Sequence, residues 1–277
     1  MSEEKTGQKS LVTYHKEGYV GLITLNRPEK RNALSLALWN ALDEAIRLAG
    51  EDEEARVILL RGEGKSFCSG LDISPESELT AALGGTPGAS QKLNFFRLVR
   101  ELQDIHTRLE RLTRPTLAVI HGHCLGAGLE LVLCCDFRLC SQETIFALPE
   151  AKLGLITDVG GLQRLPKIVG PGHAREMAFR GNQFDAARAQ AVNLVNDVYA
   201  DKETLDAKAM EMAEEIASNP PLAVQGAKEV MLFDEEVSLD QSLDYNAARS
   251  CMIVPSEDLF EAITAYTQKR KGEFKGA

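Results

Sequence analysis

His121-Gly-His-Cys-Leu-Gly-Ala-Gly128 is the stretch that decides the fold, because it joins a strand to a helix through a glycine-rich turn. The apolar, β-branched run Thr116–Ile120 before it predicts a buried strand, and the apolar run Leu129–Cys135 after it predicts a helix. Small residues let a ligand approach the backbone closely, and the N–H groups of a first helical turn have no acceptor within the helix. The sequence therefore predicts an anion or oxyanion site at this turn.

Three acidic residues follow in mostly apolar surroundings: Glu130, Glu150 and Asp158. Each has an ordinary interpretation on its own. Glu130 would complement the positive end of its helix, Glu150 would be a solvated loop residue, and Asp158 would cap the helix that follows it. As a group, however, carboxylates beside free backbone N–H groups are the minimum equipment for moving protons next to a carbonyl. We therefore take all three as candidate catalytic residues.

Composition and charge exclude several classes of protein. With 277 residues the chain can bury a large core, and its 31 Lys and Arg against 41 Asp and Glu give a net charge of -10. No basic stripe with interleaved aromatic residues and no apolar run of membrane-spanning length is present, so we expect neither nucleic-acid nor membrane partners. Residues 1–5 do not resemble a presequence, and residues 274–277 do not form a peroxisomal tripeptide, so we expect a cytoplasmic protein.

The six cysteines form no C-x-x-C pair, which is the usual sign of a zinc site. His121, His123 and Cys124 lie close together, but neighbouring positions at the end of a strand do not all point the same way. We therefore expect no metal site and interpret the cysteines as buried, reduced thiols.

Upstream of the glycine-rich stretch the pattern is that of an α/β fold. The expected elements are a hairpin of two strands, a helix and a buried parallel strand, at residues 11–15 and 19–25, 36–49 and 57–60. Ser35 stands where the cap of the helix belongs. The basic turn before this helix, Asn26–Leu34, fits either a solvated loop or a contact to a phosphorylated ligand.

A second tight turn, Cys68–Asp72, follows the strand at 57–60. Ligands of α/β folds usually bind at the carboxyl ends of strands, which makes this turn a second candidate binding segment. The nearby run Gly64-Lys-Ser66 resembles the end of a phosphate-binding P-loop. Leu59 stands where that motif requires a glycine, so we reject a nucleotide hydrolase.

An irregular loop and then a long helix are expected after this turn. Residues 73–91 contain several glycines and prolines and predict an irregular loop. A helix over 93–112 follows, with His106 on its polar or boundary face and without a role. The residues expected to point inward are Phe96, Leu98, Val99, Leu102, Ile105 and Leu109.

From about residue 201 onward only helices are expected. We therefore divide the chain into a core at 1–200 and a helical oligomerisation region at 201–277. An apolar stripe on the last helix either packs on its own subunit or forms a subunit interface. Its residues are Leu259, Phe260, Ile263 and Tyr266.

Four segments together carry a resemblance to a known family: Leu25–Leu34, Phe67–Asp72, His121–Glu130 and Gly160–Leu165. With them the chain resembles the crotonase (enoyl-CoA hydratase/isomerase) superfamily over nearly its whole length. The resemblance implies an α/β fold with a spiral ββα core and a helical C-terminal trimerisation region. It also implies a homo-oligomer, either a trimer or a dimer of trimers, and an acyl-CoA thioester as substrate. No separate cofactor is expected, because coenzyme A is part of that substrate.

The same resemblance assigns roles to residues in both turns. It implies that the N–H groups of Leu71 and Ala127 form an oxyanion hole. It further implies a set of substrate-binding residues, namely Lys30, Ser69, Gly70, Leu71, Asp72, Ile73 and Ala127.

Within the superfamily, position 158 separates two reactions. Hydratases resemble this chain in having glutamates at the positions of Glu130 and Glu150, but usually have glycine at the position of Asp158. An acid there, and the segments Val224–Lys228 and Ser242–Tyr245, resemble the Δ3,5-Δ2,4-dienoyl-CoA isomerases of fatty-acid β-oxidation. The animal members of that subfamily have aspartate where this chain has Glu130.

We therefore expect an isomerase that moves a proton from C2 to C6 of an acyl-CoA thioester through an oxyanion-stabilised dienolate. Glu150 would act at C2 and Asp158 at C6, while Glu130 tunes the pair. One alternative is a 2-enoyl-CoA hydratase that uses Glu130 and Glu150, with Asp158 as a helix cap. An alternative of another class is a non-catalytic acyl-CoA-binding protein.

Overall fold

The computed structural model describes residues 10–84 and 88–277. Residues 1–9, which include the polar N-terminal segment, and residues 85–87, in the predicted loop, lie outside the described residues. The predicted hairpin is confirmed, because β1 (Val12–Glu17) pairs antiparallel with β2 (Val20–Leu25). The other strands of the main sheet run parallel to β2, and the sheet has the order β1-β2-β3-β4-β6-β9. They are β3 (Val57–Gly62), β4 (Thr116–Ile120), β6 (Phe137–Ser141) and β9 (Asp197–Tyr199).

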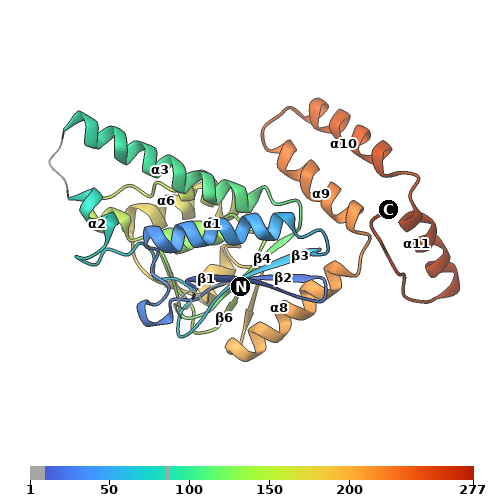
Figure 1. Ribbon diagram of the computed structural model, residues 1–277, viewed down its shortest axis with the longest axis horizontal. Helices are drawn as coiled ribbons and strands as arrows, with labels where there is room; N and C mark the ends of the chain where they lie inside the picture. The colour runs from blue at the N-terminus through green and yellow to red at the C-terminus, as the bar shows by residue number, and fades with distance from the viewer. Residues whose placement is uncertain (1–9, 85–87) are drawn as a thin grey trace, which may run out of the picture.

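Helices cover both faces of this sheet (Figure 1). Because successive strand side chains point to opposite faces, Ile23 joins one core cluster and Leu22 the other. The cluster of Ile23 is closed by α1 (Leu36–Glu51) and α3 (Ala89–Glu110), and that of Leu22 by α8 (Lys202–Ala217). The predicted cap of α1 is confirmed, since the Ser35 hydroxyl accepts a hydrogen bond from the Leu38 N–H.

A second, smaller sheet contains β5 (His123–Leu125), β7 (Ile145–Ala147) and β8 (Phe184–Asp185), which alternate along the chain with the last strands of the main sheet. Strand β5 falls inside the stretch that we had predicted as a turn alone. The shorter helices of this part are α4 (Ala127–Val132), η2 (Glu150–Leu153), α5 (Gly161–Val169), α6 (Pro171–Arg180) and α7 (Ala186–Ala191).

The C-terminal region is helical, as predicted. Helix α8 packs on the sheet, and α9 (Pro221–Asp234) is tied to the α/β body by the buried Lys228, which donates to Asp136 at 2.7 Å. Helices α10 (Leu239–Ile253) and α11 (Glu257–Gln268) lie farther from the body (Figure 1). On α11, Phe260, Ile263 and Tyr266 are 62%, 54% and 87% exposed. The apolar stripe therefore does not pack on its own subunit. Within the two described ranges, no helix combines the length and the apolar character needed to cross a bilayer.

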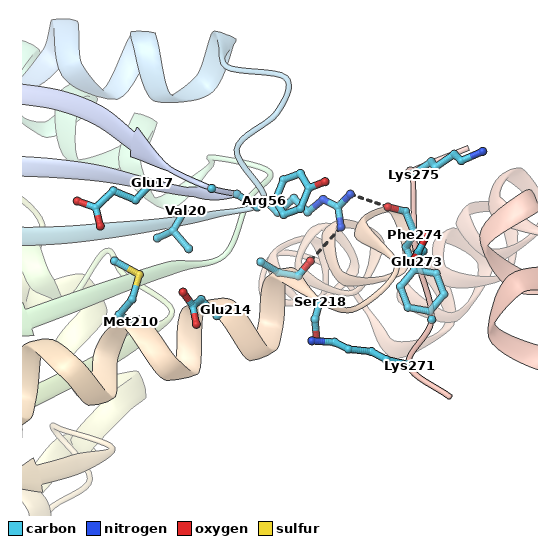
Figure 2. Close-up of a pocket in the computed structure, with 14 residues that line it drawn as sticks. Glu17, Val20, Arg56, Met210, Glu214, Ser218, Lys271, Glu273, Phe274 and Lys275 are labelled. Carbon is cyan, nitrogen blue, oxygen red and sulfur yellow. Dashed lines mark hydrogen bonds between the residues drawn. The ribbon is translucent and has the colours of Figure 1, made fainter. Parts of the chain in front are cut away.

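The segment after α11 returns to the sheet and borders a cleft of about 770 Å³ between the β1–β2 hairpin and α8 (Figure 2). Arg56 binds the segment after α11 at this cleft. Its guanidinium donates to the carbonyl oxygens of Phe274 (2.6 Å) and Ala217 (3.0 Å) and lies 3.9 Å from the centre of the Tyr19 ring. These three contacts use the charged group of Arg56 to join the tail to the body.

The region between β3 and β4 differs from its prediction in three ways. The loop predicted at 73–91 contains α2 (Glu78–Leu83), which begins with a hydrogen bond from the Leu79 N–H to the Ser77 hydroxyl, and α3 begins at Ala89. Phe96 is 61% exposed rather than inward, because the buried stripe of α3 passes one residue before it, through Phe95. His106, predicted on the boundary face, is fully buried.

Candidate active site

Two turns from distant parts of the sequence meet backbone to backbone. The Cys68 N–H donates to the His123 oxygen (2.9 Å), and the Leu125 N–H donates to the Cys68 oxygen (3.0 Å). Gly70 has a φ of +92° and lies so close to Leu125 that an added Cβ would be 2.9 Å from the Leu125 oxygen. Only glycine meets both demands, which explains its place in the Cys68–Asp72 turn.

Each turn presents a free N–H group to the pocket. Leu71 lies between two fixed peptides, because the Leu34 N–H donates to the Gly70 oxygen (2.8 Å) and the Asp72 N–H to the Leu34 oxygen (3.0 Å). Ala127 is the first residue of α4, where N–H groups have no helical acceptor. In the part of the chain that the structure describes, neither the Leu71 nor the Ala127 N–H has an acceptor, and both residues line one pocket. Two free N–H groups on residues of one pocket are compatible with the predicted oxyanion hole, which stays a prediction.

The basic turn that precedes α1 supports the Cys68–Asp72 turn through Asn32. The backbone of Asn32 has a φ of +55°, and its side chain is fully buried. The side-chain amide donates to the backbone oxygens of Glu63, Ser66 and Phe67 at 2.9 to 3.0 Å. Sequence reasoning had treated this turn only as a source of positive charge. The signal available was the asparagine itself, which adopts positive φ more readily than most residues.

The predicted substrate-binding residues differ in what they offer a ligand. Asp72 is buried and bonded to Arg27 at 2.6 Å. Burial acts to raise the pKa of Asp72, but hydrogen bonds from Ser74 and Arg27 outweigh it and lower the pKa to about 2. Its carboxylate is therefore an internal ion-pair partner, and only its backbone faces outward. Lys30, in η1 (Pro28–Lys30), and Ile73 are exposed.

The structure brings the three predicted acids together with both free N–H groups. Glu130, Glu150 and Asp158 line the same pocket as Leu71 and Ala127. The remaining wall is apolar and consists of Leu79, Phe95, Leu98, Val99, Leu102, Leu155, Ile156 and Val159. Carboxyl groups in such a wall lose hydration, which favours their protonated forms.

Glu150 lies at the start of η2, directly above the turn that carries Ala127. Gly126 has a φ of +52°, and an added Cβ there would be 2.5 Å from Glu150 Oε1. The Thr157 hydroxyl donates to Glu150 Oε2 (3.2 Å). Burial, with a smaller contribution from the charge of Asp158, raises the pKa of Glu150. Its carboxyl group is thus held next to one of the free N–H groups.

Glu130 performs the capping task that the alternative interpretation gave to Asp158. Its Oε2 accepts hydrogen bonds from the Gly161 N–H (2.7 Å) and the Val159 N–H (3.1 Å), at the start of α5. The cap position of that helix is Gly160, so the interpretation of Asp158 as a helix cap is wrong. Burial raises the pKa of Glu130 to about 8, despite the two backbone bonds, and the neighbouring acids act in the same direction.

Asp158 is half-buried, and its burial raises the pKa of its carboxyl group. No other described residue donates a hydrogen bond to that carboxyl group. Its backbone is held instead by α3, because Gln103 Nε2 donates to the Asp158 oxygen (2.5 Å) and His106 Nδ1 lies 2.6 Å from the Val159 oxygen. Sequence reasoning missed both of these α3 residues.

The chain matches one family model and several known proteins. The family model described as "Enoyl-CoA hydratase/isomerase" matches residues 15–277. A protein of Arabidopsis thaliana named peroxisomal Δ(3,5)-Δ(2,4)-dienoyl-CoA isomerase is 35% identical over 275 residues, which is 99% of each chain. The 2,3-dehydroadipyl-CoA hydratase of Escherichia coli K12 is 34% identical, over 92% of this chain and 94% of its own. A crystal structure of an enoyl-CoA hydratase from Bacillus anthracis matches with a TM-score of 0.87 and 32% identity, over 96% of this chain and 100% of its own.

Proposed function

This chain belongs to the enoyl-CoA hydratase/isomerase family, and on that premise we propose that it is a Δ3,5-Δ2,4-dienoyl-CoA isomerase of fatty-acid β-oxidation. The observation that carries the proposal is the environment of the Asp158 carboxyl group. Its carboxyl group lines the pocket without a structural partner among the described residues, while Glu130 caps α5 in its place. An acid that is half-buried, raised in pKa and free of structural duty fits proton transfer.

The reaction explains why a second acid is needed. Conversion of a 3,5-dienoyl thioester to its 2,4 isomer removes a proton from C2 and adds one at C6, four bonds away. C2 is bonded to the thioester carbonyl carbon, whose oxygen would accept from the N–H groups of Leu71 and Ala127. The Glu150 carboxyl group lies close to Gly126, the residue before Ala127, which supports a role for Glu150 at C2. Asp158 then serves C6.

Charge and proton balance follow from this assignment. Glu150 starts ionised and takes the C2 proton, the dienolate charge rests on the thioester oxygen, and Asp158 starts protonated and gives its proton to C6. Each donor of such an oxyanion hole typically contributes roughly 2.7 to 4 kcal/mol in other enzymes. After one turnover the two acids have exchanged protonation states. The starting state returns when Glu150 releases the C2 proton to water and the partly exposed Asp158 takes a proton from water.

The coenzyme A portion of the substrate would lie over the exposed side of the first turn. Ser69, Leu71 and Ile73 are partly or fully exposed there, the buried Gly70 and Asp72 complete the turn, and Lys30 adds a positive charge for a phosphate. No separate cofactor is needed for the reaction. The exposed apolar stripe on α11 supports a homo-oligomer built through the C-terminal helices, either a trimer or a dimer of trimers. Location in the cytoplasm stays a prediction, since the Arabidopsis relative is named a peroxisomal protein.

A second candidate function is hydration of a 2-enoyl-CoA. It is favoured by one observation, namely that Glu130 and Glu150 both line the pocket, as a pair of carboxyl groups that bind and activate one water would have to do. The Escherichia coli relative bears the name of such a hydratase. In this function Asp158 would have no chemical role.

One pair of assays separates the candidates. The purified protein is given a 3,5-dienoyl-CoA while the absorbance of the conjugated 2,4-dienoyl thioester is followed, and a 2-enoyl-CoA while loss of its double bond is followed. Fast isomerisation that Asp158→Asn lowers by about 10² to 10⁴ fold supports the proposal. Wild-type rates in Asp158→Asn refute the two-acid mechanism, and fast hydration without isomerisation establishes the hydratase. Absence of both reactions points to the non-catalytic acyl-CoA-binding protein.

A further inference from the structure

One polar face of α3 is directed at the segment that carries Asp158. Gln103, His106 and Glu110 are three and four residues apart and so lie on the same face of the helix. Gln103 Nε2 donates to the Asp158 oxygen at 2.5 Å, and His106 Nδ1 is 2.6 Å from the Val159 oxygen. Glu110 binds Arg164 of α5 through both carboxylate oxygens, at 2.6 and 2.7 Å. Helix α3 thus binds the carbonyl groups of two consecutive residues, Asp158 and Val159, and also binds α5, the helix that follows them.

The opposite side of the same segment is held by Glu130, whose Oε2 accepts from the N–H groups of Val159 and Gly161. The peptide groups around Asp158 are therefore fixed from two directions. Its side chain, in contrast, has no hydrogen bond from another described residue. The fixed backbone therefore sets where the Asp158 side chain leaves the chain and the direction of its Cα–Cβ bond, which limits the positions that the carboxyl group can reach.

The chemistry of His106 makes this contact specific. A carbonyl oxygen only accepts, so the proton of the neutral ring must be on Nδ1, and Nε2 has no partner among the described residues. The ring is fully buried with its edge toward Trp39, at 5.1 Å between ring centres, and burial lowers the pKa of His106 to about 4. The imidazole is therefore a neutral donor at physiological pH.

We propose that Gln103 and His106, the α3 clamp, are positioning residues that fix the Asp158 carboxyl group against the C6 end of the substrate. This inference rests on the proposed isomerase function. Phe95, Leu98 and Leu102 on the same helix line the apolar wall of the pocket. One rigid element therefore holds both the acyl chain and the acid, so that the distance between C6 and the acid depends on α3. Misplacement of a catalytic group by about 1 Å can cost on the order of 10² fold in rate.

The variants Gln103→Met and His106→Phe remove each donor while keeping side-chain volume or ring packing. His106→Asn is the matched rescue, because the asparagine N–H can take the place of Nδ1–H. We expect the two clamp variants to lower the kcat of isomerisation by about 10 to 100 fold, with KM within about twofold of wild type. His106→Asn should keep at least about a third of the wild-type kcat.

A partial reaction distinguishes positioning of Asp158 from general damage. Exchange of the C2 proton of the substrate with D₂O needs Glu150 and the oxyanion hole but not Asp158. We expect wild-type exchange rates in Gln103→Met and His106→Phe, as in Asp158→Asn. A parallel loss of C2 exchange and isomerisation would overturn the inference, and so would unchanged isomerisation in both clamp variants.

Hydrogen–deuterium exchange of the backbone between residues 158 and 161 gives a readout that is independent of activity. The clamp variants should exchange faster there than wild type, and His106→Asn should not. If wild type lacks isomerisation while the clamp variants still show this faster exchange, the proposed function fails and the clamp remains a structural fact. If wild type isomerises and backbone exchange is unchanged in the variants, the clamp fails alone.

Discussion

The two sides of the pocket are built by different means. The oxyanion side consists of the turns at Cys68–Asp72 and Leu125–Gly128, which backbone hydrogen bonds join and close glycine contacts bring together. The acid side consists of the segment from Glu150 to Gly161, which is held by side chains of other helices, chiefly Glu130, Gln103 and His106. The oxyanion side therefore fails when a glycine gains a side chain, whereas the acid side fails when a side chain loses its polar atom.

The largest effect is expected where the two sides touch. In Gly126→Ala the new methyl group would lie 2.5 Å from Glu150 Oε1, at a φ of +52° that alanine rarely adopts. Relief of that contact must move either the Glu150 carboxyl group or the Ala127 N–H. We expect both isomerisation and C2 exchange to fall by at least about 10³ fold, measured with the 3,5-dienoyl-CoA substrate.

Gly18→Ala is the matched control for Gly126→Ala. Gly18 also has a positive φ, +59°, but an added Cβ would meet nothing within 4 Å. We expect its cost to be confined to roughly 1 to 2 kcal/mol of folding free energy, with wild-type turnover. Equal activity of the two variants would show that the close approach of Gly126 and Glu150 is irrelevant to catalysis.

Glu130→Gln tests whether the acid side contains two working acids or three. A glutamine oxygen can still accept from the Val159 and Gly161 N–H groups, so the start of α5 should be preserved. Hydration of a 2-enoyl-CoA, if wild type performs it, should fall by about 10² fold or more, because it needs two carboxyl groups at one water. Isomerisation should fall by less than about tenfold. Equal losses in both assays would place Glu130 in the isomerase mechanism itself.

The features that could be predicted from the sequence belong mainly to the sheet and the oxyanion side, and those that were missed belong mainly to the acid side. The hairpin, the Ser35 cap and the parallel strands depend on local patterns of caps and apolar runs, whereas the N–H groups of Leu71 and Ala127 were implied by the family resemblance of the two turns. The α3 clamp depends on partners far along the chain, since Gln103 and Asp158 are 55 residues apart and His106 and Val159 are 53 apart. Neither residue has a local signal, because a histidine on a helix reads as a boundary residue until its partner is known.

Sequence alone also could not decide whether Asp158 or Glu130 caps α5. An acid three residues before a helix start fits a capping role by sequence, and the competing acceptor, Glu130, is 29 residues away from Val159. The three acids were identified correctly as members of one pocket, but the assignment of structural duty among them required the fold. Helix α2 was missed for a related reason, because the glycines and prolines around it obscured a short run of helix-forming residues.

The buried acid side should make folding stability depend on pH. Glu130 has a pKa of about 8 in the folded protein and an ordinary value of 4.5. Between these values the unfolded chain binds fewer protons at this site than the folded one. The contribution of Glu130 to the free energy of unfolding is therefore greatest below pH 4.5 and falls as pH rises toward 8. The slope from this one group is at most about 1.4 kcal/mol per pH unit.

Glu130→Gln removes that slope and leaves the contributions of Glu150 and Asp158. Urea unfolding between pH 5 and 8, followed by the fluorescence of Trp39, the single tryptophan of the chain, should show wild type losing stability relative to the variant as pH increases. Parallel curves for the two proteins would mean that Glu130 is ionised in the folded state. The oxyanion side has no counterpart to this effect, since its working groups are peptide N–H groups that do not titrate in this range.

The smallest effect is expected from Lys30, on the rim of the oxyanion side. Its side chain is exposed, so its attraction for a substrate phosphate is screened by water and salt. Lys30→Ala should raise KM for a dienoyl-CoA by about two- to fivefold at low ionic strength, leave kcat unchanged and lose its effect at high salt. Lys208→Ala, which removes an exposed lysine from α8, is the control for net charge and should leave KM unchanged. A fall in kcat for Lys30→Ala would mean that this rim residue also orders the turn that presents the Leu71 N–H.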